Sequence, residues 1–341
     1  MNLLIVPLVT ILLGAEPQNS VFVQMTREGL AADAEGKTGA KLAPPTMADG
    51  LDAVAQRRAI EEVARPKRRV EDLLKNAVVA PFVLEIKDVA GGRAAEPLRQ
   101  VDVWYAVYGT LDQFFDEDFF QSLVDLAHGE KKSRLPVTKG VLKEADLRSR
   151  GIPIADAAGV KERYCYGTFD LFDRVLLSVT RHVVATRQAD SVLVAAAIDS
   201  RFMQDAKYPN QWRAVKMDQR REFTLGPPQP YALSASYTKI TRLHEPPGAL
   251  WIEHHQLFAE PEGWFGGKNL LRSKLPLAVQ ESVRKLRWQF RGKQAEAADV
   301  TVHGAETKGT GPCFRPTLLC KKDVDLPKNG PVPDRPVNRY Q

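Results

Sequence analysis

The sequence has few cysteines for its length of 341 residues. Only Cys165, Cys313 and Cys320 are present, which is too few for a disulfide scaffold, and the odd number leaves at least one thiol outside any disulfide. Cys313 and Cys320 could close a small loop in the C-terminal tail, or both could remain thiols. We therefore expect the fold to depend on a hydrophobic core, for which 44% hydrophobic residues are sufficient.

The sequence also lacks the motifs of common catalytic and phosphate-binding sites. No serine lies in a Gly-x-Ser-x-Gly motif, and Gly266-Gly267-Lys268 is followed by Asn269 instead of the Ser or Thr of a phosphate-binding loop. The acidic cluster 112–118 does not have the spacing of a calcium loop. The sequence therefore predicts no particular catalytic residue, no metal and no cofactor, and it favours a protein that is not an enzyme.

A positively charged folded body is also absent, although the net charge is +6. Residues 57–75 hold seven basic and four acidic side chains, and residues 291–341 hold nine basic and six acidic ones. The rest of the chain is balanced, with 32 side chains of each sign. Nucleic-acid binding needs a basic face on the folded domain. The charge distribution therefore predicts no nucleic-acid partner.

Long apolar runs are absent except at the N-terminus, where Leu3–Leu13 is almost wholly apolar. This run is too short to span a bilayer, which takes about 20 residues, and it suits the core of a signal peptide cut after Ala15. We therefore expect a signal peptide at 1–15 and export to the periplasm or the extracellular space. A cytosolic protein with a misassigned start is the alternative, because no basic residue precedes the run.

Composition divides the remainder of the chain into three parts. Residues 16–50 are rich in Ala, Gly, Thr and Pro without periodicity, which predicts a disordered linker. Residues 51–291 carry periodic patterns and are expected to form a single α+β domain with an irregular, charged insertion at 129–160. Residues 292–341 are rich in Pro, Gly and Lys, which predicts a disordered basic tail.

Periodicity within the domain predicts mostly strands, followed by one long helix. Alternation of apolar residues predicts strands at Val78–Val89, Val101–Thr110, Tyr164–Leu171, Arg174–Thr186, Ser191–Arg201, Gln211–Leu225, Ser236–Leu243 and Ala249–Glu260. Helical spacing predicts helices at Leu51–Lys75, broken at Pro66, at Leu111–His128, and near Leu142–Arg150. A longer amphipathic helix follows Gly267 and ends near Arg291; its apolar stripe includes Leu275, Val283 and Phe290.

This order of elements resembles the helix-grip arrangement of the START-like superfamily. The resemblance covers roughly residues 57–291 and rests on the strand pair Tyr237–Glu260 followed by the terminal helix. It implies an α+β fold in which a curved antiparallel sheet packs on a long C-terminal helix. It also implies an apolar cavity that binds a lipid or another hydrophobic small molecule.

Four residues are candidates for the lining of such a cavity: Tyr105, Arg181, His182 and Trp251. Pockets for small molecules are mostly apolar with a few polar groups. Either Arg181 or His182 is expected to point inward from a strand, where it needs a ligand or an internal carboxylate as its partner.

Two other functions remain open. A hydrolase or lyase on the same scaffold would use a polar group such as His254 or His255, whose side chains point to opposite faces of a strand. Glu253 and His255 share a face, so they are a weak candidate for a metal or acid–base site; the alternative is that they occupy a solvated or edge position. An envelope structural or interaction protein would use the basic tail at 292–341 instead.

Overall fold

The computed structural model describes most of the chain between residues 18 and 304: 18–30, 39–66, 68–93, 96–115, 135, 138–154, 159–217, 222–262, 264 and 270–304. The chain divides into two compact units, Met1–Ala297 and Ala298–Gln341. The fold below belongs to the first unit; of the second, only helical backbone at 298–304 is described. The predicted signal peptide and the pair Cys313 and Cys320 lie outside the described residues.

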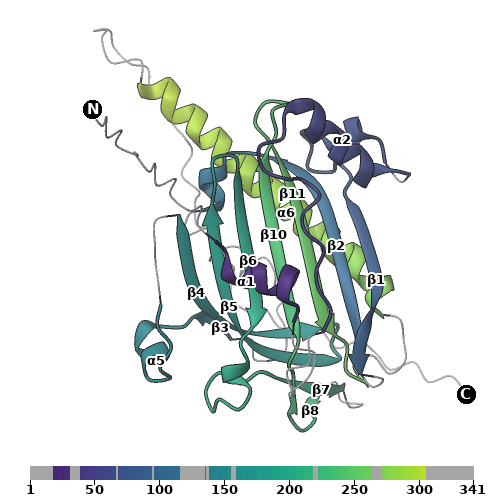
Figure 1. Cartoon of the computed structure of the whole chain (residues 1–341), viewed down its shortest axis with the longest axis vertical. Coiled ribbons are helices and arrows are strands. Elements are labelled where there is room, and N and C mark those ends of the chain that lie inside the picture. Colours follow the sequence, from purple (N-terminus) through teal and green to yellow (C-terminus); the bar gives the residue numbers. More distant parts are fainter. Residues whose placement is uncertain are drawn as a thin grey trace, which may run out of the picture. The chain divides into compact units, whose positions relative to one another are not determined.

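One antiparallel sheet organises the first unit (Figure 1). Its strands, in spatial order, are β1 (Val83–Arg93), β2 (Glu96–Tyr108), β11 (Ala249–Ala259), β10 (Ser234–Arg242), β6 (Ser191–Ile198), β5 (Val175–Arg187), β4 (Val160–Leu171) and β3 (Lys139–Val141). The second half of β5 pairs with β6 and its first half with β7 (Gln211–Met217), which also pairs with β8 (Phe223–Leu225) and β9 (Gln229–Pro230).

A long C-terminal helix, α6 (Leu270–Gly304), packs on one face of this sheet. Its apolar stripe meets the sheet in two clusters: Leu286 and Phe290 pack on β2, β10 and β11, and Leu275 and Val279 pack nearer β1. The predicted α+β fold, an antiparallel sheet on a long C-terminal helix in helix-grip order, is confirmed. The helix continues to Gly304, however, so the predicted disordered tail begins with helical backbone.

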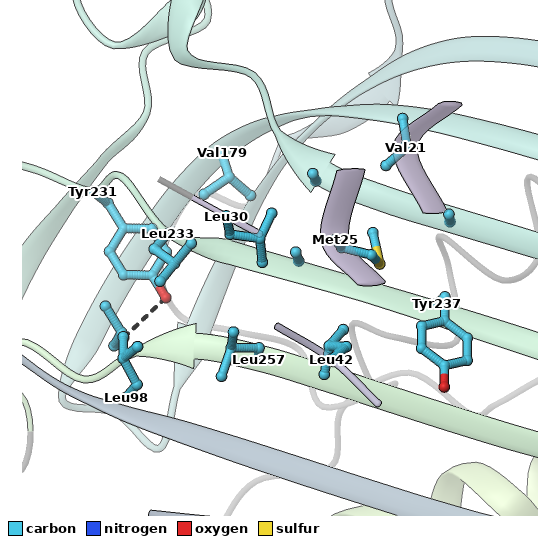
Figure 2. Packing of buried hydrophobic residues seen from close by; sticks show 14 of the residues in the cluster. Val21, Met25, Leu30, Leu42, Leu98, Val179, Tyr231, Leu233, Tyr237 and Leu257 are labelled. Carbon is cyan, nitrogen blue, oxygen red and sulfur yellow. Dashed lines mark hydrogen bonds between the residues drawn. The ribbon is translucent and has the colours of Figure 1, made fainter. Parts of the chain in front are cut away.

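The opposite face of the sheet is covered by the described parts of the N-terminal segment, residues 18–30, 39–66 and 68–80. This segment contains α1 (Ser20–Val23), the π-helical turn η1 (Gln24–Glu28), α2 (Ala53–Ala64) and α3 (Val70–Leu73). Figure 2 shows Met25, Leu30 and Leu42 lying over the strands that carry Tyr237 and Leu257.

The disordered linker expected at 16–50 is corrected by these contacts over residues 18–30 and 39–50. Met25, Leu42 and Met47 are each at most 1% exposed. A few apolar side chains, spaced without periodicity, are enough to attach this segment because each inserts separately between side chains of the sheet. Composition averages over such isolated anchors and therefore predicts disorder.

The remaining elements are short. The first turn of the predicted helix Leu111–His128 is a 3-10 turn, η2 (Leu111–Phe114), and the rest of it lies outside the described residues. The short helix expected near Leu142–Arg150 is present as α5 (Glu144–Arg148), and η3 (Ser200–Phe202) follows β6. None of the helices in the described part of the chain is long and apolar enough to cross a membrane.

Candidate functional site

The central strand β11 presents alternate residues to the two faces of the sheet. Trp251 packs against α2 and α3, so it marks the face covered by the N-terminal segment, which we call the N-terminal face. Leu250 and Ile252 pack against α6, so they mark the helix face. His254 therefore lies on the helix face and His255 on the N-terminal face, which confirms that the two histidines point apart.

The four predicted lining residues are divided between these faces. Tyr105 pairs with Ile252 in register and lies on the helix face. Arg181 pairs with Ile198, which alternates along β6 with Val192 of the α6 cluster, so Arg181 also lies on the helix face. The structure therefore brings two of the four candidates to the same face as α6.

Trp251 and His182 lie on the N-terminal face, so they cannot line the same space as Arg181. Trp251 is fully buried among apolar residues of α2 and α3. His182 stacks on Tyr164 with ring centroids 4.7 Å apart, and its Nε2 lies 2.6 Å from Glu162 Oε1. The internal carboxylate that the sequence analysis named as one possible partner belongs to His182, not to Arg181.

The helix face carries polar groups that are removed from bulk water. His254 Nδ1 lies 2.8 Å from Thr238 Oγ1 on the neighbouring strand. Burial lowers the pKa of His254 to about 4, so the imidazole is neutral at pH 7. Burial also raises the pKa of Tyr105 above its ordinary value.

These same side chains are only partly covered by protein. Tyr105, Arg181, Thr238 and His254 all keep an intermediate share of their accessible surface. The side chains of the helix face are therefore not packed against protein on every side.

Arg181 is a charged group on the helix face. Its guanidinium carbon lies 4.9 Å from the centroid of the Phe169 ring, and its Nε is buried without a hydrogen-bond partner. Burial lowers its pKa, while the nearby Tyr231 and Cys165 oppose that shift. Within the described part of the chain no carboxylate pairs with Arg181.

A second buried arginine, Arg287 of α6, has a structural role. The sequence places it on the polar side of the helix, but it is only 6% exposed. Its guanidinium donates to the backbone carbonyls of Val78, Ala80, Pro81 and Ala106. These contacts tie α6 to β2 and to the chain entering β1. Burial lowers the pKa of Arg287 to about 10, so it stays charged at pH 7.

The N-terminal face holds a network of charged groups, of which the sequence indicated only the pair Glu253 and His255. Glu253 is fully buried and accepts hydrogen bonds from the backbone N–H of Thr46 (2.8 Å) and Met47 (2.9 Å), from the Thr46 hydroxyl, and from Trp104 Nε1 at 3.3 Å. Lys239 Nζ donates to Met47 O at 2.8 Å. These side chains attach residues 46–47 to the sheet.

His255 lies at the centre of this network. Its Nδ1 is 2.8 Å from Asp102 Oδ1, and its Nε2 is 3.9 Å from Glu253 Oε2. Burial opposes the charged imidazolium, but Asp102 and Glu253 outweigh it and raise the pKa of His255. Burial likewise opposes ionisation of the two carboxyls, yet hydrogen bonds lower the pKa of both.

The solvated or edge position expected for Glu253 and His255 is therefore wrong, because β11 is paired on both sides and covered by the N-terminal segment. A signal for this network exists in the sequence. Asp102 and Glu253 are charged residues at positions that alternate with large apolar ones, Trp104 and Trp251, on two strands of the sheet. Sequence alone did not reveal that these strands are adjacent. Among the described residues, no group of three or more His, Cys, Asp or Glu could hold a metal ion.

Comparison with known proteins adds little beyond the arrangement of elements. No family model matches the chain. No curated protein matches it either. Among solved structures, human STARD10 aligns with a TM-score of 0.30 and 10% sequence identity, over 81% of this chain and 93% of that one. So low a score supports no argument about function, and the fold assignment rests on strand order and α6.

Proposed function

We propose that this protein binds a hydrophobic small molecule or lipid between the helix face of its sheet and the elements that cover it. The observation that carries the proposal is the partial exposure of desolvated side chains in the middle of the sheet, on strands β2, β5, β10 and β11. A solid core would leave no accessible surface there, since protein interiors are packed like organic crystals.

The lining has the composition of a ligand pocket. Val194 and Ala196 on β6 face this space and are partly exposed, and they alternate with residues that pack in the core. Its polar groups are the Thr238–His254 pair, the neighbouring pair Ser236 and Gln256, the Tyr105 hydroxyl and Arg181. Ligand sites are typically apolar surfaces with a small number of polar groups that orient the ligand.

The direct test is native mass spectrometry of the purified full chain, followed by extraction and lipid analysis. We expect a non-covalent adduct of a hydrophobic molecule. Purified protein without an adduct that also binds no added amphiphile would contradict the proposal.

A space-filling variant provides the second test. Ala196→Trp places an indole in the proposed space, so we expect loss of ligand binding with a change in unfolding free energy below about 1 kcal/mol. If the helix face were solidly packed, the same substitution would cost about 1–3 kcal/mol through overpacking. The matched control is Ala145→Trp at an exposed position of α5, which should leave both binding and stability unchanged.

A second candidate function is acid–base catalysis by His254, because a histidine bonded to a hydroxyl is the arrangement that a hydrolase would need. The pKa of about 4 makes His254 a weak base at pH 7. The pair therefore suits hydrogen bonding to a ligand better than proton transfer. Turnover of activated esters that is lost in His254→Gln would favour the enzyme.

A further inference from the structure

We propose that the ligand is an amphiphile with an acidic head group, a carboxylate or a phosphate, and that Arg181 binds this group. The inference rests on the proposed function, because it concerns the same internal space. It adds the chemical class of the ligand and the residue that selects it.

The contrast between the two buried arginines supports this assignment. Arg287 is satisfied by four backbone carbonyls, which is how a buried arginine with a structural role avoids the cost of desolvation. Arg181 forms no hydrogen bond within the described part of the chain, and its Nε is buried without a partner. An arginine carries five N–H donors in a planar fork, so an acceptor must come from elsewhere.

An anion is the partner that this geometry fits. A guanidinium can donate two parallel hydrogen bonds to a carboxylate or a phosphate, and such charge-assisted bonds are about twice as strong as neutral ones. No described carboxylate competes for Arg181, whereas Glu162 is already bonded to His182 on the opposite face. Burial of the guanidinium strengthens its attraction for an anion that enters the same space.

The residues around Arg181 indicate where the head group and the apolar chain of the ligand would each lie. Phe169 lies under the guanidinium at 4.9 Å, and Ile198 is its partner on β6. His254 lies within electrostatic range of Arg181, since the positive charge of Arg181 contributes to the low pKa of His254. A neutral imidazole can add a hydrogen bond to the head group. The apolar chain would then lie along Val194 and Ala196 toward α6.

Isothermal titration calorimetry on the full chain, after removal of any copurified ligand, tests the inference with four probes: dodecanoate, dodecyl phosphate, dodecanol and inorganic phosphate. We expect the two anionic amphiphiles to bind about tenfold to a hundredfold more tightly than dodecanol, in line with charged hydrogen bonds. The ratio of dodecanoate to dodecyl phosphate affinity distinguishes the two head groups. Arg181→Gln should reduce both to the affinity of dodecanol.

The control variant is Arg148→Gln, which removes the same charge from an exposed helix, where the Arg148 side chain is 76% exposed. It should bind all four probes like the unmodified protein. Equal affinity for dodecanoate and dodecanol, unchanged by Arg181→Gln, would contradict the claim that the ligand has an acidic head group. It would not contradict the proposed function. Binding of inorganic phosphate without binding of any amphiphile would contradict the claim that the ligand is an amphiphile. Absence of all binding would contradict the proposed function itself.

Stability of the ligand-free protein gives an independent readout. Removal of an unpaired buried charge is neutral or stabilising, whereas removal of one partner of a buried pair is strongly destabilising. We therefore expect Arg181→Met to keep or raise the midpoint of urea unfolding while it abolishes the preference for anionic amphiphiles. A clearly lower midpoint would assign Arg181 a structural role and contradict the inference.

Discussion

The two faces of the sheet differ in whether the protein supplies hydrogen-bond partners for their buried charged side chains. On the N-terminal face, His255 lies between Asp102 and Glu253, and Lys239 is bonded to the backbone of the covering segment. On the helix face, Arg181 has an aromatic ring beneath it and no hydrogen bond in the described structure. The fold therefore supplies carboxylates beside the buried histidine of one face and none beside the buried arginine of the other, within the described part of the chain.

The difference follows from what covers each face. The N-terminal segment crosses the sheet partly as extended chain, so its backbone N–H and C=O groups at Thr46 and Met47 are available to side chains below. A helix such as α6 uses its own backbone groups internally and presents an apolar stripe. Polar residues beneath a helix must therefore find partners among side chains or in a ligand.

The largest effect that we expect comes from Glu253→Gln. The change removes the charge that accepts four hydrogen bonds and leaves His255 and Lys239 with less compensation. Breaking a buried ionic network of this kind costs about 3–5 kcal/mol. Urea unfolding measures it, with the exposed Glu144→Gln as control, expected to cost less than about 1 kcal/mol. A cost for Glu253→Gln as small as that of the control would show that the network does not stabilise the protein.

The packing of the N-terminal segment is tested by Met25→Ala. Met25 is fully buried between this segment and the sheet. A large-to-small change at such a position costs about 2–5 kcal/mol. Met217 is 60% exposed, so Met217→Ala is the matched control with an expected change within about 0.5 kcal/mol. Equal effects at both positions would mean that residues 18–30 are not part of the cooperative core.

A smaller effect is expected for Tyr237→Phe. The Tyr237 hydroxyl donates to Ala43 O at 2.6 Å and so connects β10 to the covering segment. Loss of one neutral hydrogen bond costs about 1 kcal/mol, and the aromatic ring that stacks on His255 remains. Amide hydrogen exchange should show faster opening near residues 43–47 than in the unmodified protein. Unchanged exchange there would mean that this bond does not hold the segment.

The smallest signal is the opposite titration of the two adjacent histidines. The pKa of His254 is about 4, below its ordinary 6.5, so the unfolded chain takes up its proton first, and this residue lowers stability as pH falls from about 6.5 to about 4. The raised pKa of His255 adds stability below pH 6.5 that is lost as pH rises through that pKa. NMR titration, assigned with His254→Gln and His255→Gln, measures both. Midpoints that coincide would contradict the assignment of the two faces.

Periodicity predicted the architecture because each strand keeps a local pattern. The alternation at Ala249–Glu260 gave both ends of β11, and the stripe from Leu275 to Phe290 gave the start of α6 within a few residues but not its end at Gly304. Prediction failed where attachment depends on isolated contacts. Met25 and Leu42 lie in a segment without periodicity, and no local pattern indicates that their side chains pack on the sheet.

The candidate site could be predicted only in part, because alternation shows which residues share a face but not what packs against that face. Alternation implied that Arg181 and His182 point to opposite faces, but not which of them would meet a carboxylate. Trp251 was one of the four residues expected to line the cavity, and it packs against α2 and α3 instead. Only the folded chain determines which face of the sheet packs against α6 and which packs against the N-terminal segment.

The sequence by itself determined an antiparallel sheet, a terminal amphipathic helix and the opposed directions of His254 and His255, because these follow from repeats of two and of 3.6 residues. Tertiary structure decided the rest. Pairing of β2 with β11 placed Asp102 beside His255, and the N-terminal segment enclosed them. Pairing of β5 with β4 and β6 placed Arg181 over the Phe169 ring without a carboxylate partner in the described structure, since contacts between distant segments determine which charges are paired.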